Sequence, residues 1–384
     1  MGTLSAHPSF ARPGKTAGKS VRRRRPLRAV LLVLLALAIL IPASAGAYLV
    51  NLGRIYDSET TKIDNAFPDE ATRPQPSVPG ASAGSAPGGA PGGAPAAGPA
   101  VSGGPSPSDA GRSLNFLVMG SDSRGATAEE ATTGVGSNQR ADTLMLVHIP
   151  ADRSKIYSIS MMRDLWVGIP NHGQAKINAA LAYGGVPLMV QTVESIFGQR
   201  IDHIAMIDFE GFVGMTDALG GVQVDIQAPF VSAHDQFAYR AGPNTLDGEH
   251  ALEFVRERYA FADGDYQRVR NQQAFVKALL ARNVSADTLL NPLKVHNVVS
   301  AIAPFISVDS GLDAATLAGL AMELKDVRPH DMVMFTLPTR GTGTSADGQS
   351  IVLTDPAAIN AISRAMATDT LGDYVASNGL QGGN

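Results

Sequence analysis

Apolar and polar positions in the C-terminal two thirds of the chain follow two periods, one typical of strands and one typical of helices. Strands are expected where short β-rich runs end at turn residues or charges, at 114–119, 142–149, 155–161, 203–209, 222–226 and 331–338. Helices are expected at 176–183, 187–197, 210–219, 247–258, 265–282 and 357–367. This alternation predicts an α/β or α+β fold, with a mixed central sheet between helical layers.

Residues with special backbone preferences mark the ends of several helices. Gly184 and Gly185 are expected to stop one helix, and Pro187 to open the next, because proline suits a first turn. Asp247 and Asp265 are expected as N-caps, since a carboxylate there accepts free backbone N–H groups.

Residues 29–50 form an uncharged, mostly apolar stretch behind a basic tail at 1–28. Helical residues rise about 1.5 Å each, so the stretch would span ~33 Å, the thickness of a hydrocarbon core. The basic tail favours a cytoplasmic N-terminus. We therefore predict a single-pass protein of the cell membrane with its folded part outside. A cleaved signal peptide is the alternative, because Pro42 and the segment 43–45 (Ala-Ser-Ala) resemble a processing site.

The segment 51–111 is predicted to be an extracellular linker. From about Ala71 it consists mainly of Pro, Gly, Ala and Ser, which cannot bury enough apolar area to fold. The main domain is expected at 112–290 and an extension of it at 291–370. Residues 371–384 are expected to be a flexible tail.

Charge and composition exclude several classes of protein. Residues 1–28 hold eight of the 31 Lys and Arg and no Asp or Glu, so the remainder carries a net charge of −12. An acidic domain argues against nucleic-acid binding, which needs a basic surface. The chain has no cysteine, which excludes disulfides, thiolate metal sites and a cysteine nucleophile. The eight histidines show no metal-ligand spacing.

Five short clusters combine arginines with acids or an amide. They are Asp122-x-Arg124, Arg140-x-Asp142, Arg163-Asp164, Arg256-x-Arg258, and Asp265 with Arg268 and Gln272. Guanidinium groups hold phosphate through paired donors, and carboxylates suit Mg²⁺, which often shares its ligands with substrate phosphates. The first three clusters fall at predicted strand ends, where open α/β sheets commonly bind ligands. Together the clusters predict a site for a pyrophosphate and a metal.

Each cluster also has a simpler structural explanation. An Arg-x-Asp pair is more often a surface ion pair, Asp265 can be a helix cap, and Asp164 can be a turn residue. Arg256 and Arg258 are two residues apart, so they diverge on a helix and converge only if the helix loosens there. The weight of the prediction rests on recurrence at equivalent ends of elements.

Apolar positions at helical spacing lie between the clusters. They are Ile177, Leu181, Leu188, Met189, Val193, Ile196, Phe197, Phe212, Val213 and Met215. Ordinary core packing explains such spacing, and a pocket for a lipid chain is the alternative.

At these residues the chain resembles the LytR–CpsA–Psr family of cell-envelope proteins. The segments that carry the resemblance are 115–124 (NFLVMGSDSR), 140–149 (RADTLMLVHI), 159–170 (ISMMRDLWVGIP), 176–185, 201–212, 217–226, 246–259 (LDGEHALEFVRERY) and 265–273 (DYQRVRNQQ). The linker of low charge suggests an actinobacterial member. In one departure from the family pattern, Met161 and Met162 stand where Ile-Pro usually precedes the Arg-Asp pair.

The resemblance implies a deep apolar cleft for a polyprenyl chain, with a pyrophosphate at its mouth. It implies that Asp122 and Asp142 hold Mg²⁺, with Mn²⁺ as a substitute, and that Asp265 orients the phosphate ligands. The implied phosphate ligands are Arg140, Arg163, Arg256, Arg258, Arg268 and Gln272, with Arg124 as a further member of the first motif. The implied catalytic residues are Arg140, Arg163, Arg256 and Arg258.

The activity implied is a phosphotransferase that moves a glycopolymer from a polyprenyl-pyrophosphate carrier to a hydroxyl of peptidoglycan. Two alternatives stay open: a non-catalytic regulator that binds polyprenyl pyrophosphate, and a pyrophosphatase that uses water as acceptor. Which polymer is transferred, and which carboxylate serves as base, also stay open.

Overall fold

The computed structural model describes residues 46–75, 111–122, 140–283, 288 and 291–380. The chain divides into two compact units, 1–51 and 52–384. In the first unit, the described residues 46–51 are helical. Within the described ranges, no helix is both long enough and apolar enough to cross a membrane. The predicted basic tail and most of the predicted anchor lie outside those ranges.

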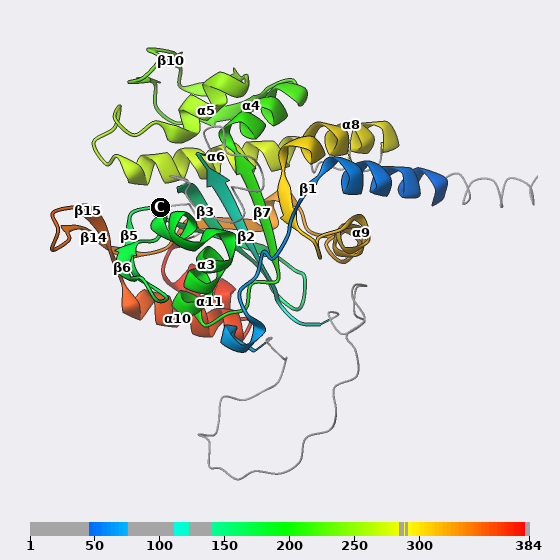
Figure 1. Ribbon diagram of the computed structural model, residues 1–384. Helices are drawn as coiled ribbons and strands as arrows, with labels where there is room; N and C mark the ends of the chain where they lie inside the picture. Colours follow the sequence, from blue (N-terminus) through cyan, green and yellow to red (C-terminus); the bar gives the residue numbers. More distant parts are fainter. Residues whose placement is uncertain (1–45, 76–110, 123–139, 284–287, 289–290, 381–384) are drawn as a thin grey trace, which may run out of the picture. The chain divides into compact units, whose positions relative to one another are not determined.

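A seven-stranded mixed sheet forms the centre of the second unit (Figure 1). Its strands in spatial order are β1 (Thr61–Ile63), β12 (Ser307–Asp309), β7 (His203–Asp208), β2 (Leu114–Ser121), β3 (Ala141–Ile149), β4 (Ile156–Met161) and β13 (Met332–Thr336). The pairs β1–β12, β7–β2 and β4–β13 are parallel, and the others are antiparallel. The predicted mixed sheet is therefore confirmed.

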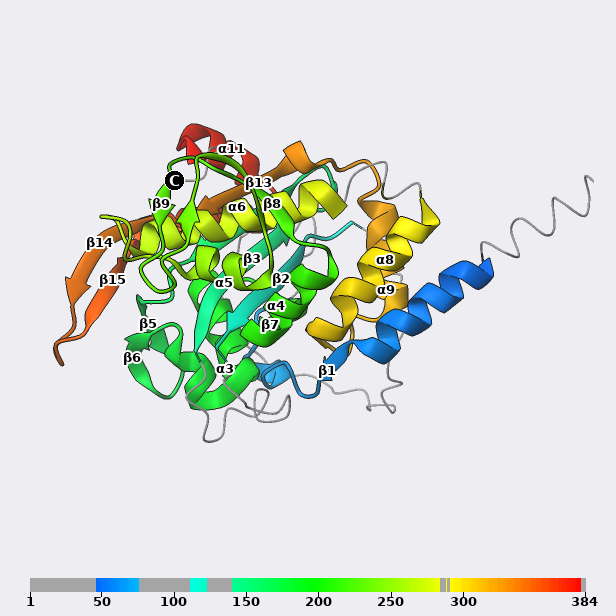
Figure 2. The same cartoon turned by 90° about the horizontal axis from the view of Figure 1, so that it is seen from above.

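Alternation along the strands sends side chains to two different helical layers. Leu117 and Leu146 are cross-strand partners in the main core, which also contains residues of α3 (Ala179–Phe197) and α10 (Pro356–Ala367). The neighbouring pair Val118 and Met145 points to the opposite face. There lie α4 (Phe209–Ala218), α5 (Gly248–Arg256) and α6 (Asp265–Asn283), as Figures 1 and 2 show.

The predicted helices largely agree with the structure. Asp247 caps α5, and its carboxylate accepts the His250 N–H at 3.0 Å. Asp265 was expected as a cap but is instead the first residue of α6. Gly184 and Gly185 interrupt α3 with non-helical backbone angles, and Gly185 has a φ of 63°. The predicted break between two helices is therefore present as a kink.

Several elements of the structure were not predicted. A four-stranded sheet has the order β14 (Thr339–Thr344), β15 (Ser350–Thr354), β5 (Leu165–Ile169) and β6 (Gly173–Lys176). The segment of β6 reads GQAK and carries no apolar alternation, so its strand conformation depends on pairing with β5. The prediction also missed β9 (Phe230–Val231), β10 (Ala238–Tyr239), β11 (Gly242–Leu246), α8 (Pro292–Ile302) and α9 (Ala314–Glu323). The strand β8 (Val222–Ile226), which pairs with β11, was predicted.

Two predicted boundaries are wrong. The linker was expected to begin at residue 51, yet residues 52–59 are helical and β1 joins the central sheet beside β12. Residues 371–384 were expected to be a tail, yet Leu371–Ser377 form α11, with Leu371 and Val375 buried. The sequences of both segments are polar or irregular, and long-range packing decides their conformation.

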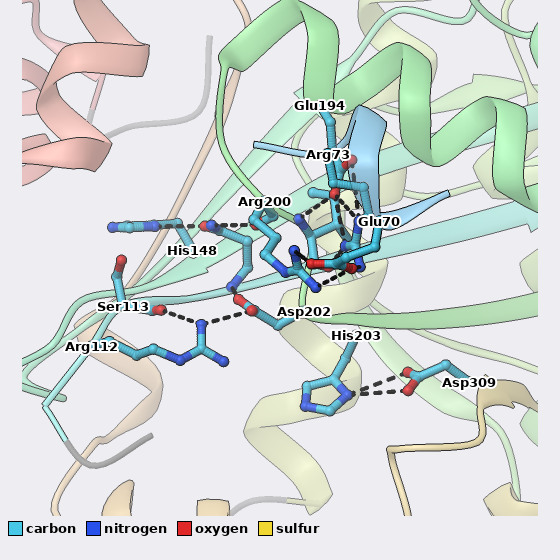
Figure 3. Close-up of polar contacts among 12 residues, drawn as sticks. Glu70, Arg73, Arg112, Ser113, His148, Glu194, Arg200, Asp202, His203 and Asp309 are labelled. Carbon is cyan, nitrogen blue, oxygen red and sulfur yellow. Dashed lines mark hydrogen bonds and ion pairs between the residues drawn. The ribbon is translucent and has the colours of Figure 1, made fainter. Parts of the chain in front are cut away.

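Ion pairs fix the segment around β1 to the end of the sheet where β2 and β7 begin (Figure 3). The Arg73 guanidinium is buried against Glu194 of α3 at 2.8 Å and also donates to the Ile201 carbonyl. Glu70 accepts two bonds from Arg200, at 2.5 and 2.9 Å. The folded unit therefore includes residues well upstream of the predicted boundary at 112.

Candidate functional site

A cavity of about 290 Å³ lies at the opposite end of the central sheet, between the strand ends and α4, α5 and α6. Its walls include the ends of β2 and β7, the start of β3, and Arg163, two residues after β4. The strand register places these points together, because Ser121 pairs with both Ala141 and Asp208. The predicted clustering at strand ends is therefore present in three dimensions.

Four of the predicted arginines line this cavity: Arg163, Arg256, Arg258 and Arg268. Asp142 and Gln272 line it as well. Arg268 and Gln272 are four residues apart on α6 and present one face to the cavity. Three segments distant in the sequence, at 163, 256–258 and 268–272, thus deliver positive charge and hydrogen-bond donors to one volume.

Arg256 and Arg258 both reach the cavity because α5 ends between them. Arg256 is the last residue of the helix, and Glu257 adopts extended backbone angles (φ −63°, ψ 131°). The chain beyond it no longer turns by 100° per residue, so the two side chains need not diverge. Arg256 lies over the Phe209 ring at 4.5 Å, and Arg258 over the Tyr259 ring at 4.6 Å.

A carboxylate lies close to each of these arginines. Arg163 Nη1 lies 2.5 Å from Asp142 Oδ1, while its Nε is 3.9 Å from Asp164. Arg258 and Arg268 share Oδ1 of Asp265, at 3.5 and 3.2 Å. Burial would raise the pKa of Asp265, but Arg268, Arg163 and Arg258 hold it below its usual range. Asp265 is therefore ionised and orients two arginines from outside the cavity wall.

Arg268 is the most deeply buried of the four arginines, with 3% of the residue exposed. Among the described residues, its Nε and Nη2 have no hydrogen-bond partner. Burial lowers its pKa to about 10, and the neighbouring Arg163 cation adds to the effect. A buried guanidinium with free donors beside a second guanidinium is unfavourable by itself and favours an anion between them.

The rest of the cavity wall is largely apolar. These residues are Val118, Met119, Met145, Ile207, Phe209, Phe212, Leu252, Val255, Phe275 and Val276. Of the apolar positions that were predicted as core or lipid pocket, only Phe212 is in this wall. Ile177, Leu181, Met189, Val193 and Phe197 are instead buried in the main core. Ordinary packing therefore accounts for most of that set.

Several predicted site residues lie outside the cavity wall. Asp122 and Arg140 pair through their backbones at 3.3 Å, and Asp122 Oδ1 also accepts the Arg140 N–H at 3.2 Å. The exposed Arg140 is therefore placed at the mouth of β3 rather than in the wall. Asp164 forms an ion pair with Lys176 at 3.2 Å. Arg124 lies outside the described residues.

Three further acids line the cavity and were not predicted: Asp208, Glu253 and Glu257. Asp208 caps α4, and its carboxylate accepts the Gly211 N–H at 2.7 Å. Glu253 lies 3.7 Å from Arg256 and 3.6 Å from His234. Glu257 stands directly between Arg256 and Arg258 in the sequence, and this position could have identified it as a site residue. Nothing in the local sequence of Asp208 or Glu253 distinguishes them from ordinary surface acids.

The donor set can be compared with what Mg²⁺ requires. The described residues contain no group of three or more His, Cys, Asp or Glu side chains that could hold a metal ion. Mg²⁺ is often bound by one or two carboxylates together with substrate phosphates. Asp142 of β3 lies in the cavity wall, and Asp122, which follows β2, is hydrogen-bonded to Arg140 beside the start of β3. These two carboxylates fit the second arrangement. The residues therefore fit a metal that arrives with a phosphorylated substrate.

The geometry defines a class of site: an apolar cavity that ends in clustered arginines and suits a large amphipathic anion. The model of the LytR_cpsA_psr family matches residues 98–368, so the chain belongs to that family and the resemblance is confirmed.

Individual relatives agree with this assignment. The chain is 37% identical over 216 residues to "Probable cell wall biosynthesis protein LcpB" of Corynebacterium glutamicum, covering 55% of this chain and 52% of that protein. It therefore spans about half the length of the curated relatives it matches.

Among solved structures, TagV of B. subtilis shares the fold, with a TM-score of 0.57 and 21% identity over 68% of this chain and 98% of that one. A structure described as TagT bound to LI-WTA has a TM-score of 0.52 and 23% identity, covering 69% and 92% of the two chains.

Proposed function

We propose that the protein is a phosphotransferase that attaches a glycopolymer to peptidoglycan, taking it from a polyprenyl-pyrophosphate carrier at the outer surface of the cell membrane. The observation that carries the proposal is Arg268, a buried guanidinium beside Arg163 in the wall of an apolar cavity, two of whose nitrogens have no partner in the part of the chain that the structure describes. A lipid pyrophosphate supplies both parts that this cavity matches, an apolar chain and a dense negative charge.

The proposed reaction uses these groups in one displacement. An acceptor hydroxyl attacks the glycan-side phosphorus, a new P–O bond forms, and the bridging P–O bond breaks to release polyprenyl phosphate, while the hydroxyl proton passes to a carboxylate base or to the departing phosphate. Arg163, Arg256, Arg258 and Arg268 bind the phosphate oxygens and offset the charge that grows there. Asp142 and Asp122 would hold Mg²⁺, which supplies further charge neutralisation when bound. Asp265 keeps Arg258 and Arg268 aligned.

The names of similar proteins support the same assignment. One relative is described as a cell wall biosynthesis protein, and one solved neighbour is described with LI-WTA bound. These descriptions belong to those proteins, and for this chain they add weight to a glycopolymer as the transferred group.

The test is a transfer assay with a lipid-pyrophosphate-linked glycan, peptidoglycan and Mg²⁺. We expect Arg163→Ala and Arg256→Ala each to lower the rate by ~10²–10³, because each removes a charged donor at the reacting phosphates. Arg364→Ala is the matched control, since Arg364 is exposed on α10, on the other face of the sheet. Full activity of both site variants would contradict the site assignment.

The products separate the alternatives. Polyprenyl phosphate with a new wall linkage supports transfer, whereas polyprenyl phosphate alone indicates a pyrophosphatase. Binding of the lipid without any product indicates a regulator that uses the same cavity.

A further inference from the structure

The Glu257 carboxylate lies between the two arginines at the end of α5 and is almost fully buried, with 4% of the residue exposed. It accepts four backbone N–H groups. Burial would raise its pKa, but these bonds hold it below the usual range for a glutamate. Glu257 is therefore an ionised side chain; within the described ranges its hydrogen-bond partners are main-chain donors, and it forms no ion pair there with either neighbouring guanidinium.

One carboxylate oxygen shapes the segment that carries Arg258. Oε1 accepts the N–H groups of Arg258, Tyr259 and Ala260, at 2.8, 2.7 and 3.1 Å. Three successive donors on one oxygen fix the backbone directly after the helix, where α5 would otherwise continue or fray. The Arg258 side chain then meets Tyr259 Oη at 2.5 Å and Asp265 at 3.5 Å.

The second oxygen reaches a different part of the chain. Oε2 accepts the Ala233 N–H at 2.7 Å, in the connection between β9 and β10. His234, the next residue, lines the cavity. The same carboxylate thus joins two walls of the cavity, the segment 256–260 and the connection 232–237.

We propose that Glu257 is a positioning residue of the pyrophosphate site: it holds Arg256 and Arg258 on one wall and the connection 232–237 on the other in the geometry that binds the anion. This inference rests on the proposed function for the identity of the ligand. It adds a residue whose effect passes through main-chain hydrogen bonds and involves no contact with the phosphates.

The test uses the full chain and farnesyl pyrophosphate as the probe, with Kd from calorimetry and melting temperature from scanning fluorimetry. Glu257→Ala removes the two oxygens that accept the four N–H groups, so we expect Kd to rise by about tenfold or more. Glu257→Gln keeps an oxygen for the three donors of 258–260 but presents an NH₂ group to Ala233. We expect its Kd to stay within about threefold of wild type. Glu249→Gln is the control, because Glu249 is exposed in the first turn of the same helix.

Hydrogen exchange gives a readout that does not depend on the ligand. In Glu257→Ala the amides of residues 258–260 should exchange faster, while those of the central sheet should not. The proposal is overturned if folded Glu257→Ala binds the probe as wild type does. It is also overturned if the alanine and glutamine variants lose the same affinity and that loss follows the decrease in their melting temperatures.

Failure of the proposed function gives a different result. Wild type that binds farnesyl pyrophosphate but transfers no glycan contradicts transfer and leaves the role of Glu257 in place. Wild type that does not bind the probe contradicts both.

Discussion

Burial decides the charge state of individual side chains in this domain. Arg268 keeps its charge although burial lowers its pKa, because Asp265 lies 3.2 Å away. His148 is compensated less well: it is fully buried, its Nδ1 lies 2.8 Å from Asn115 Oδ1, the partly exposed Asp369 is 3.8 Å from its Nε2, and its pKa is lowered to about 4. Burial is the main cause, and the Arg153 cation adds to it. His148 is therefore neutral in the folded protein at any pH well above 4.

The His148 pKa predicts how stability depends on pH. In the unfolded chain histidine titrates near 6.5, so between pH 6.5 and 4 the unfolded state binds a proton that the folded state does not. Stability is complete above pH 6.5 and falls as pH decreases to 4, by about 3 kcal/mol in all. Urea unfolding at pH 7.0, 5.5 and 4.5 measures this slope.

The control for this prediction separates His148 from other titrating groups. His148→Gln should lose most of the slope, although it is less stable overall. His330→Gln should keep the slope, because His330 is largely exposed. Equal slopes in wild type and His148→Gln would show that other groups cause the pH dependence.

At the scale of elements, the kink in α3 depends on one glycine. Gly185 has a φ of 63° and is buried, so an alanine there would hold a left-handed conformation inside the core. We expect Gly185→Ala to destabilise the protein by about 1–2 kcal/mol. Gly319→Ala should instead stabilise the protein by about 0.5–1 kcal/mol, because Gly319 lies within α9 and the added Cβ would meet no atom within 4 Å. Denaturant midpoints of the two variants on opposite sides of wild type would confirm the prediction; a shift of both in the same direction would contradict it.

The segment around β1 depends on one buried ion pair. Arg73→Ala would leave the Glu194 carboxylate buried, and within the described part of the chain its remaining hydrogen bond is from the Ile201 N–H, at 2.9 Å. We expect a loss of about 3–5 kcal/mol, since a buried charge without its counter-ion is costly. Glu70→Ala removes the Glu70–Arg200 bridge, in which Glu70 is largely exposed, and should cost no more than about 1 kcal/mol. Comparable losses in both variants, measured by chemical unfolding, would contradict this distinction.

At the scale of the whole molecule, both ends of the Pro/Gly/Ala-rich segment are tied to the same turn. On one side Arg73 binds Glu194 and the Ile201 carbonyl, and on the other Arg112 binds Asp202 at 2.7 Å (Figure 3). Residues 76–110 therefore connect two points of one folded unit, whereas the sequence had suggested a tether in front of it.

This arrangement predicts that the segment 76–110 can be shortened. Replacing it with about ten Gly and Ser residues should change the free energy of unfolding by only about 1 kcal/mol, because loop closure depends weakly on length. Farnesyl pyrophosphate binding should persist. A chain that starts at residue 112 should be much less stable, since it lacks β1 and leaves Glu194 without Arg73. Equal stability of the two forms would contradict the inclusion of residues 52–75 in the domain.

The sequence by itself determined the elements whose pattern is local and the residue types of the site. β2, β3, β7 and α5 carry clear apolar periods, and Arg and Asp clusters stand at the ends of several of them, so both were predictable from neighbouring residues. Only the tertiary structure decided what distant pairing controls. β1, β6 and α11 have weak patterns of their own and form because a partner elsewhere in the chain supplies their hydrogen bonds or their core.

The same distinction holds within the site. The charge of Arg163, Arg258 and Arg268 is evident from the sequence, but their shared cavity, the burial of Arg268 and the place of Arg140 outside the wall depend on the fold. Glu257 illustrates the limit most clearly. Its position between two arginines is visible in the sequence, whereas its four main-chain partners lie in two segments that only folding brings together. Local sequence fixes chemical type and period, while burial and distance arise from contacts between residues far apart in the chain.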